Sequence, residues 1–320
     1  MRNHPDLFYA KILLFGEYSV LLNSMGLSIP YTHFRGEFSF IGEDKYTDRN
    51  FAKRSNQELL KYFSYLKDNA KVFESLLDLS SFSKDIHSGL YFESTIPESY
   101  GLGSSGALCA AIYKKYGYSP ITNIKKLGNG EIIKLKAVLS QLESGFHGKS
   151  SGLDPLNSYL KVPLLIHNQE KIEQVNLPGK KFGEDSAIFL IDTGKKGNTE
   201  PLVRSFLRKC ESTEFASLIE SEFIPLNNSC ISELVNGKVD SFFTDLENLS
   251  QFQLNHFTEM IPESFEDIWM EGLKNQKYWL KLCGSGGGGY LLGFTRNFSE
   301  TKQFLEKSGY DIVTVYQNEK

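Results

Sequence analysis

A run of glycine and serine at residues 101–107 constrains the fold of this chain more than any other feature. The run reads Gly-Leu-Gly-Ser-Ser-Gly-Ala and follows a β-branched and aromatic stretch at 90–96, which predicts a strand ended at Pro97. Small and apolar residues recur at helical spacing over 108–115, so we expect the run to form the N-terminus of a helix. Unpaired N–H groups and the positive end of the helix dipole favour a phosphate there.

Two other interpretations of this run stay open. Gly101, Gly103 and Gly106 also have the spacing of the dinucleotide fingerprint, which would indicate a hydride-transfer enzyme. That fold needs an acidic residue roughly 20 positions beyond the glycines to bind the ribose hydroxyls. Here the first acid after the run is Glu131. The other alternative is a structural glycine turn without a ligand, and a loop for nucleotide phosphates is the interpretation we favour.

Length, charge and cysteine content limit the function classes. A chain of 320 residues is long enough for two domains. Its formal charge of −4 is spread along the sequence and predicts no surface for nucleic acid or for an anionic membrane. The four cysteines have neither close pairing nor metal-ligand spacing, and no apolar stretch approaches the ~20 residues of a membrane span. We therefore expect a cytoplasmic enzyme with reduced thiols, without nucleic-acid or membrane partners.

Two elements of the N-terminal half carry a charged residue in an apolar setting. The expected strand at 10–15 contains Lys11 and is otherwise apolar, as in a strand covered on both faces. We expect this lysine to be held there for an anion, the alternative being a solvent-facing side chain. The expected helix at 131–146 has Glu143 close to its apolar stripe. This carboxylate is either functional or solvated.

The C-terminal part of the sequence has the order of a ferredoxin-like domain. The pattern predicts a strand at 187–191, mostly helices to about 274, strands at 278–283 and 290–294 around a glycine run, a helix at 299–308 and a strand at 312–316. A domain boundary near residue 183 follows from this order. The glycine run at 284–289 is either a lid over a ligand or an ordinary tight hairpin.

The segment at 143–154 supplies the side chains that phosphoryl transfer needs. A helix end delivers Glu143, and a glycine-bearing loop then delivers His147, Ser151 and Asp154. A bridging metal needs hard oxygen ligands, and an acceptor hydroxyl needs an anionic neighbour. The alternatives are a histidine that only contacts the last carbonyls of its helix, and an aspartate that only forms a turn before Pro155.

Three motifs in order resemble those of the GHMP kinases. The first lies at residues 11–20, the second at 97–107 and the third at 284–289. The spacing of the histidine, serine and aspartate in 143–154 is most similar to the mevalonate kinase branch of that family. The resemblance implies an α+β fold with an N-terminal ATP-binding domain at 1–182, similar to ribosomal protein S5 domain 2. It also implies a ferredoxin-like C-terminal domain at 183–320, with the active site in the cleft between the two domains.

The resemblance also implies roles for individual residues, with ATP and Mg²⁺ as cofactors. The ATP phosphates would be wrapped by Gly101, Leu102, Gly103, Ser104, Ser105, Gly106 and Ala107. Mg²⁺ would be held by Ser105 and Glu143, and the catalytic residues would be Asp154, as base or orienter, and Lys11. The acceptor pocket would be shaped by Glu17, Tyr18, His147, Ser151 and Thr199. The third motif is represented by Gly284, Ser285, Gly286 and Gly287.

The chain departs from the family pattern at three places, of which the first and third affect backbone geometry, whereas Tyr18 is expected to face the acceptor. The chain has Tyr9 and Ala10 where the family usually has proline and glycine, Tyr18 where it has histidine, and Ser150 where it has proline. We expect phosphorylation of the primary hydroxyl of mevalonate. The alternatives are phosphomevalonate, a sugar, and a non-catalytic nucleotide-binding regulator. Lys195 and Lys196 would face the carboxylate of mevalonate or the phosphate of phosphomevalonate, or would be solvated. The resemblance leaves a homodimer open.

Overall fold

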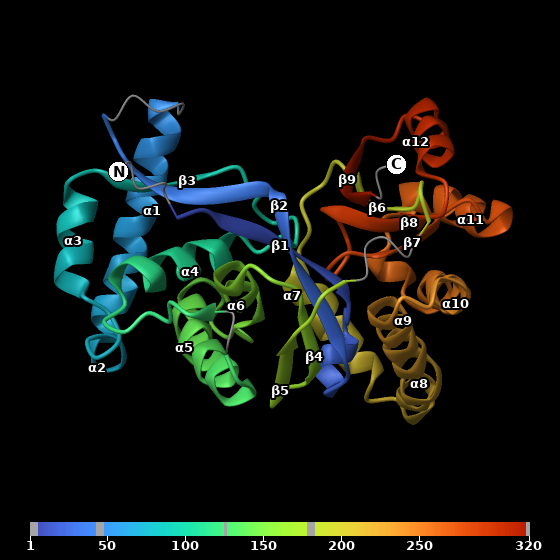
Figure 1. The fold of residues 1–320 in the computed structure, drawn as a ribbon, viewed down its shortest axis with the longest axis horizontal. Helices are drawn as coiled ribbons and strands as arrows, with labels where there is room; N and C mark the ends of the chain where they lie inside the picture. Colours follow the sequence, from blue (N-terminus) through green and yellow to red (C-terminus); the bar gives the residue numbers. More distant parts are fainter. Residues whose placement is uncertain (1–5, 43–47, 125–126, 178–182, 318–320) are drawn as a thin grey trace. The chain divides into compact units, whose positions relative to one another are not determined.

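The computed structural model describes residues 6–42, 48–124, 127–177 and 183–317 (Figure 1). Contacts between Cα atoms divide the chain into two compact units. Unit 1 consists of Met1–Lys11, Pro30–Pro97 and Leu102–Lys161, and unit 2 consists of Ile12–Ile29, Glu98–Gly101 and Val162–Lys320. These units are defined by contacts alone, and the two-domain division near residue 183 stays a prediction.

Unit 1 combines a short antiparallel strand pair with helices. The strands β1 (Phe8–Phe15) and β2 (Gly26–Phe40) each begin or end in it. Its other elements are α1 (Arg49–Asp68), α2 (Ala70–Phe73), α3 (Leu79–His87), β3 (Leu90–Ser94), α4 (Ser104–Tyr116), α5 (Asn129–His147) and α6 (Leu153–Leu160). The first sheet has the order β1-β2-β4-β5, with β3 paired to β2.

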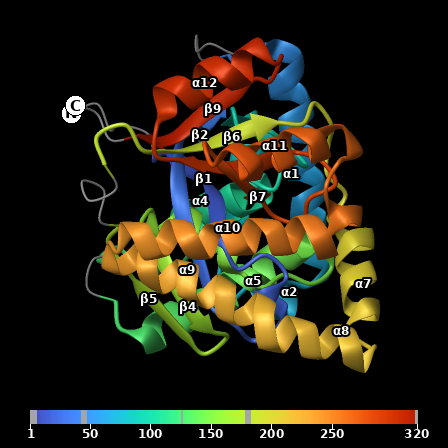
Figure 2. The ribbon, with the colours of Figure 1, turned by 90° about the vertical axis from the view of Figure 1, so that its right-hand side faces the viewer.

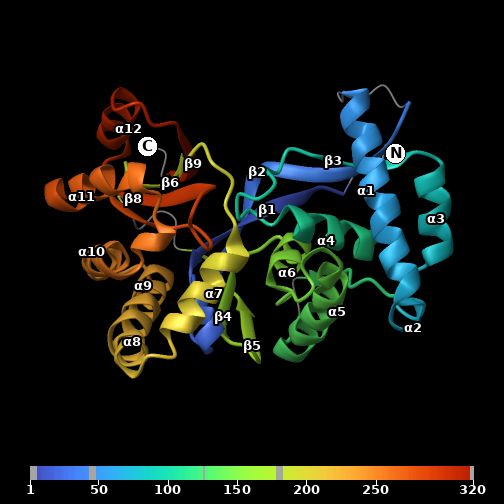
Figure 3. The same ribbon diagram turned by 180° about the vertical axis from the view of Figure 1, so that it is seen from behind.

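The helices α4, α5 and α6 pack together in unit 1 (Figure 3). On α4, Ala107, Ala110 and Ala111 are fully buried, and such small side chains let a neighbouring helix approach closely. On α5, the apolar stripe that the sequence predicts is buried through Ile132, Leu135, Leu139 and Leu142. This packing brings the first turns of α4 and α6 and the last turns of α5 into one region.

Unit 2 contains the remaining strands and helices. These are η1 (Ser19–Leu22), β4 (Leu164–Asn168), β5 (Lys171–Gln174), β6 (Ala187–Asp192), α7 (Thr199–Lys209), α8 (Thr213–Leu218), the π-helical turn η4 (Ile219–Phe223), α9 (Ile224–Asn236), α10 (Val239–His256), η5 (Thr258–Met260), η6 (Glu263–Phe265), α11 (Glu266–Asn275), β7 (Trp279–Leu282), β8 (Tyr290–Thr295), α12 (Phe298–Lys307) and β9 (Ile312–Gln317). The helices α9 and α10 lie side by side (Figure 2).

The second sheet confirms the ferredoxin-like order that the sequence predicts. Its strands have the order β7-β8-β6-β9, and the three neighbouring pairs are antiparallel. Gly293 lies opposite Phe189, and a Cβ at this glycine would lie 2.2 Å from the phenylalanine ring. The glycine therefore makes room for a buried aromatic side chain in the middle of the sheet.

Several elements were predicted close to their observed bounds, whereas others were missed. The strands at β1, β3, β6 to β9 and the helices α5 and α12 were expected from periodicity. The long strand β2 and the hairpin of β4 and β5 were not, because β2 mixes exposed polar residues with buried ones and does not alternate regularly. No helix within the described ranges is long and apolar enough to cross a membrane.

Candidate active site

The predicted phosphate loop forms the turn into α4. Gly101 and Gly103 have φ angles of +75° and +74°, a left-handed conformation that glycine adopts without steric cost. Gly103 is the N-cap of α4, a helix of 13 residues. Between these glycines, the carbonyl of Leu102 accepts a hydrogen bond of 3.0 Å from the backbone N–H of Lys11. The start of α4 therefore has the local geometry of an anion-binding helix N-terminus and is tied to β1.

An ion pair between Lys11 and Asp154 lies against this loop. The ammonium of Lys11, a residue that is 8% exposed, lies 3.0 Å from the Oδ1 atom of Asp154. Asp154 belongs to the first turn of α6, and its side chain is 34% exposed. A Cβ added at Gly103 would lie 3.0 Å from the side chain of Lys11 and 3.2 Å from Oδ2 of Asp154. The loop backbone therefore directly contacts both members of the pair.

Gly106 sets the distance between α4 and Asp154. A Cβ at this position would lie 2.7 Å from the backbone nitrogen of Pro155 and 2.8 Å from the carbonyl carbon of Asp154. Both of those atoms are backbone and belong to α6, so they have little freedom to move aside. The glycine is therefore needed for the close approach that holds Asp154 beside the loop.

A buried carboxylate with two hydroxyl donors lies next to the same helix turn. Ser105 donates a hydrogen bond of 3.1 Å to Oε1 of Glu143, and Ser150 donates a short one to Oε2. Burial, and then the negative charge of Asp154, raise the pKa of Glu143 to about 7. The two serine hydroxyls and the positive charge of Lys11 act in the opposite direction. The role of Ser150 was missed, because the sequence marked it only as a departure from a family proline.

The pair of Ser105 and Glu143 has the donor chemistry that Mg²⁺ requires. Mg²⁺ binds hard oxygen ligands and usually keeps several waters and substrate phosphate oxygens, so one or two protein ligands suffice. The described residues contain no group of three or more histidine, cysteine, aspartate or glutamate side chains that could hold a metal by themselves. A positive ion beside Glu143 would also offset the cost of ionising a buried carboxyl group. The two residues therefore fit a magnesium ion that is shared with a bound phosphate.

Four other predicted residues are found together in unit 2. Tyr18 is 4% exposed, and its hydroxyl donates a hydrogen bond of 2.6 Å to the carbonyl of Ser285. The Ser285 hydroxyl donates a bond of 3.0 Å to the hydroxyl of Thr199 at the start of α7. Glu17 is buried, and its carboxylate lies 2.7 Å from the ammonium of Lys281. Sequence reasoning did not identify Lys281, which the apolar character of its strand could have marked as a buried charge.

The third glycine motif forms the turn between β7 and β8. Gly284, Gly286 and Gly287 have φ angles of +76°, +74° and +71°. The N–H of Gly287 donates a hydrogen bond of 2.6 Å to the carbonyl of Met260, and a Cβ at Gly286 would lie 2.3 Å from that oxygen. The motif is therefore a tightly packed turn whose backbone is fixed by hydrogen bonds on more than one side.

The remaining predicted residues have less structural support. His147 ends α5, and its side chain lies outside the described part of the structure. Ser151 is exposed, and its hydroxyl accepts a hydrogen bond of 3.3 Å from the N–H of Leu153. Lys195 and Lys196 are also exposed. Within unit 1, the structure thus brings residues 102–107 of the predicted phosphate loop together with the residues predicted for metal binding and catalysis. The roles of the predicted acceptor residues stay predictions.

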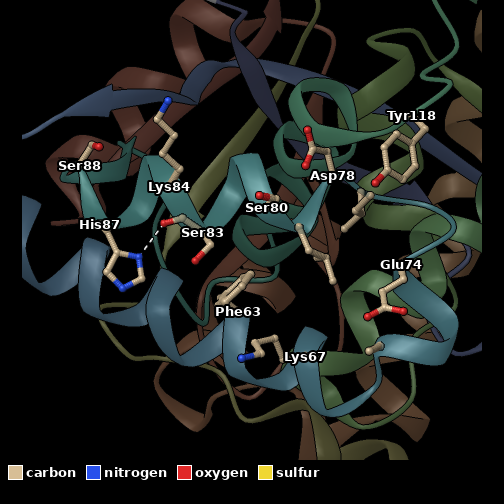
Figure 4. A pocket seen from close by; sticks show the side chains of 13 residues that line it. Phe63, Lys67, Glu74, Asp78, Ser80, Ser83, Lys84, His87, Ser88 and Tyr118 are labelled. Carbon is tan, nitrogen blue, oxygen red and sulfur yellow. Dashed lines mark hydrogen bonds between the residues drawn. The ribbon is translucent and has the colours of Figure 1, made fainter.

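A separate pocket on the outer helices shares no residue with this site (Figure 4). It is open, and its lining includes Phe63 and Lys67 of α1 and Lys84 and His87 of α3. In Figure 4, the ring of His87 is turned toward the backbone of its own helix, where Nδ1 lies 2.7 Å from the carbonyl of Ser83. This open pocket is therefore separate from the residues predicted to carry the chemistry.

Comparisons with known proteins support the fold. Residues 64–160 match the family model described as GHMP kinases N terminal domain. No curated protein sequence matches the chain significantly. Among solved structures, L. major mevalonate kinase in complex with R-mevalonate has a TM-score of 0.66 at 16% identity, covering 99% of this chain and 97% of that one.

Two further similar structures are complexes with other small molecules. Lactococcus lactis galactokinase complexed with galactose has a TM-score of 0.64 at 15% identity and covers 99% of this chain and 94% of that one. Streptococcus pneumoniae phosphomevalonate kinase, in complex with phosphomevalonate and AMPPNP, has a TM-score of 0.60 at 14% identity and covers 98% and 100%. At such identities these matches establish the fold over the full chain and leave the acceptor undecided.

Proposed function

We propose that this chain, which has the GHMP kinase fold and carries a GHMP kinase N-terminal domain at residues 64–160, is an ATP-dependent kinase acting on a hydroxyl group of a small molecule. The observation that carries this proposal is the ion pair of Lys11 and Asp154, 3.0 Å apart, against the backbone of Gly103. A cation and a carboxylate beside a helix N-terminus suit a reaction between a phosphate and a hydroxyl.

Each part of the site has a task in this reaction. The N–H groups at the start of α4 bind the phosphates of ATP. Asp154 accepts a hydrogen bond from the acceptor hydroxyl, orients it and receives its proton as the acceptor oxygen bonds to the γ-phosphorus of ATP. The bond between that phosphorus and the β,γ-bridging oxygen breaks, and ADP leaves. Lys11 stabilises the negative charge that develops on the acceptor oxygen and the transferred group. Mg²⁺, held by Ser105 and Glu143, would neutralise charge on the phosphates when bound. Because the transition state is loose, positioning contributes more than proton transfer.

We propose mevalonate as the acceptor, with its primary hydroxyl as the nucleophile. The spacing of His147, Ser151 and Asp154 resembles the mevalonate kinase branch, and the L. major mevalonate kinase has the same fold. Phosphomevalonate and galactose are the alternatives, since kinases crystallised with them share this fold as well. Incubation with ATP, Mg²⁺ and a panel of mevalonate, phosphomevalonate, galactose and homoserine separates these acceptors. Turnover of another acceptor without turnover of mevalonate would refute the choice of substrate.

The catalytic role of Asp154 can be tested with a matched control. The substitution Asp154→Asn removes the proton acceptor and is expected to lower phosphoryl transfer by about 10²–10⁴-fold, with AMPPNP binding close to that of the wild type. Asp85 forms a second aspartate–lysine pair in unit 1, with Lys115, also at 3.0 Å. Asp85→Asn is the control and should leave turnover per folded molecule unchanged. Wild-type turnover in the Asp154 variant would contradict the assignment.

A regulator that binds nucleotide without turnover is the second candidate function. A sensor has no need for Lys11, Glu143 and Asp154 together, so their joint presence beside the loop favours the enzyme. Calorimetric titration with AMPPNP and Mg²⁺, together with the acceptor panel, distinguishes the two. Tight nucleotide binding without phosphorylation of any acceptor would favour the regulator.

A further inference from the structure

Among the ion pairs of the described residues in unit 2, that of Glu17 and Lys281 is the most deeply buried. Lys281 lies on β7 and is 0% exposed, and its ammonium lies 2.7 Å from Oε1 of Glu17. The same ammonium donates a hydrogen bond of 2.6 Å to the carbonyl of Leu282 and lies 5.3 Å from the ring centre of Phe15. Removing two charges from water is costly, so such a pair is a poor source of stability and calls for another explanation.

The pair connects the first motif to the third motif. Glu17 follows β1, and its carboxylate also accepts a hydrogen bond from the backbone N–H of Gly284. The next residue, Tyr18, has a φ of +65°, which is uncommon for a side chain of this size, and it donates to the carbonyl of Ser285. Glu17 and Tyr18 therefore contact two consecutive residues of the glycine turn. Lys281 pairs with Glu17, which makes the first of these contacts.

The third motif in turn contacts the backbone that leads into the phosphate loop. A Cβ at Gly289 would lie 3.0 Å from the Cα of Tyr100, and a Cβ at Gly101 would lie 3.5 Å from the carbonyl oxygen of Cys283. The rings of Tyr100 and Tyr290 also pack at 5.1 Å between centres. Gly101 is joined directly to Leu102, whose carbonyl accepts the hydrogen bond from the N–H of Lys11. The conformation of the glycine turn therefore constrains the backbone of Gly101, the first residue of the predicted phosphate loop.

We infer that Lys281 is a positioning residue for nucleotide binding. Through Glu17 it fixes the third motif, and through the third motif it fixes the backbone at residues 100–101 where the phosphate loop begins. This inference rests on the proposed kinase function. It predicts that loss of the ion pair between Lys281 and Glu17 weakens ATP binding, although Lys281 itself is wholly buried.

A double substitution separates positioning from the burial of charge. Lys281→Met alone leaves the carboxylate of Glu17 buried without its partner, and this variant is expected to lose stability. Combining it with Glu17→Gln removes both charges and should restore much of the melting temperature. Methionine cannot donate a hydrogen bond, so the double variant is still expected to have a KM for ATP about tenfold or more above the wild type. The dissociation constant for AMPPNP with Mg²⁺, measured by calorimetry, should rise in parallel.

The exposed pair of Lys277 and Glu300 supplies the control. These side chains lie 2.6 Å apart, and the corresponding neutral double variant, Lys277→Met with Glu300→Gln, should keep the wild-type KM. If the Lys281 double variant does not fold, Glu17→Asp repeats the test, because it keeps the charge but shortens the side chain, and it should also raise the KM for ATP.

The outcomes of this experiment distinguish the two proposals. A folded double variant, or a folded Glu17→Asp variant, with wild-type affinity for AMPPNP and wild-type KM would overturn the positioning role and leave the kinase intact. A wild-type protein that neither binds AMPPNP nor phosphorylates any acceptor would instead overturn the proposed function.

Discussion

The carboxyl group of Glu143 makes the stability of the ligand-free protein depend on pH. Its pKa is raised from 4.5 to about 7, so the folded state keeps the group protonated over a pH range in which the unfolded chain releases the proton. The unfolded state therefore becomes more favourable as pH rises through this window, and the free energy of unfolding falls. At about 1.4 kcal/mol per pH unit, the difference between 4.5 and 7 corresponds to a loss of about 3 kcal/mol, complete above pH 7.

The substitution Glu143→Gln removes this dependence. Glutamine does not titrate, and its amide can bond to the hydroxyls of Ser105 and Ser150, which rotate to suit it. We expect the variant to gain stability relative to the wild type as pH rises, by about 3 kcal/mol in total and mostly between pH 5 and 8. The same substitution is expected to lower phosphoryl transfer, because a neutral amide binds Mg²⁺ less strongly than a carboxylate.

Urea unfolding at a series of pH values, without nucleotide or metal, measures the effect. The difference in free energy of unfolding between variant and wild type reports the titration of Glu143 together with its coupling to Asp154 and Lys11, because all other groups contribute equally to both proteins. The exposed side chain of Glu74 supplies the control for the exchange of glutamate for glutamine, and Glu74→Gln should change the free energy of unfolding by less than ~0.5 kcal/mol. A Glu143→Gln difference that stays constant within about 0.5 kcal/mol between pH 5 and 8 would refute the reasoning.

Two more predictions concern the contacts around Asp154. Gly106→Ala places a Cβ against the backbone of α6, so it should lower the free energy of unfolding by about 1–3 kcal/mol and reduce turnover by displacing Asp154. Gly130→Ala has open space around its Cβ and should stabilise the protein by up to ~1 kcal/mol. Thermal unfolding and initial rates measure both, and equal behaviour of the two variants would contradict the close approach. Lys11→Met should lower turnover about 10²-fold or more, while Lys115→Met in the matched pair should leave turnover unchanged. Steady-state kinetics measures the turnover of both variants, and wild-type turnover in Lys11→Met would exclude Lys11 as a catalytic group.

Local sequence signals predicted the elements that carry the site. The positive φ of Gly101 and Gly103 favours glycine, so the loop could be recognised from residue types alone. The apolar stripe of α5 identified a buried helix face and placed Glu143 beside it. Lys11 was suspected because an apolar strand rarely holds a charge without a partner. In these cases, the information lies in residues that are neighbours in the chain or one helical turn apart.

Contacts between distant residues were decided only by the tertiary structure. The sequence placed Lys11 on a strand and Asp154 on a loop, but the packing of α4 against α6 at Gly106 determines that the two side chains meet beside the predicted phosphate loop. The sequence also gave no sign that Lys281 would be buried against Glu17. Residue type and spacing fix local backbone conformation, because that depends on steric fit over a few residues. Which charges pair depends on the close packing of side chains from segments far apart in the chain, and this packing exists only in the folded protein.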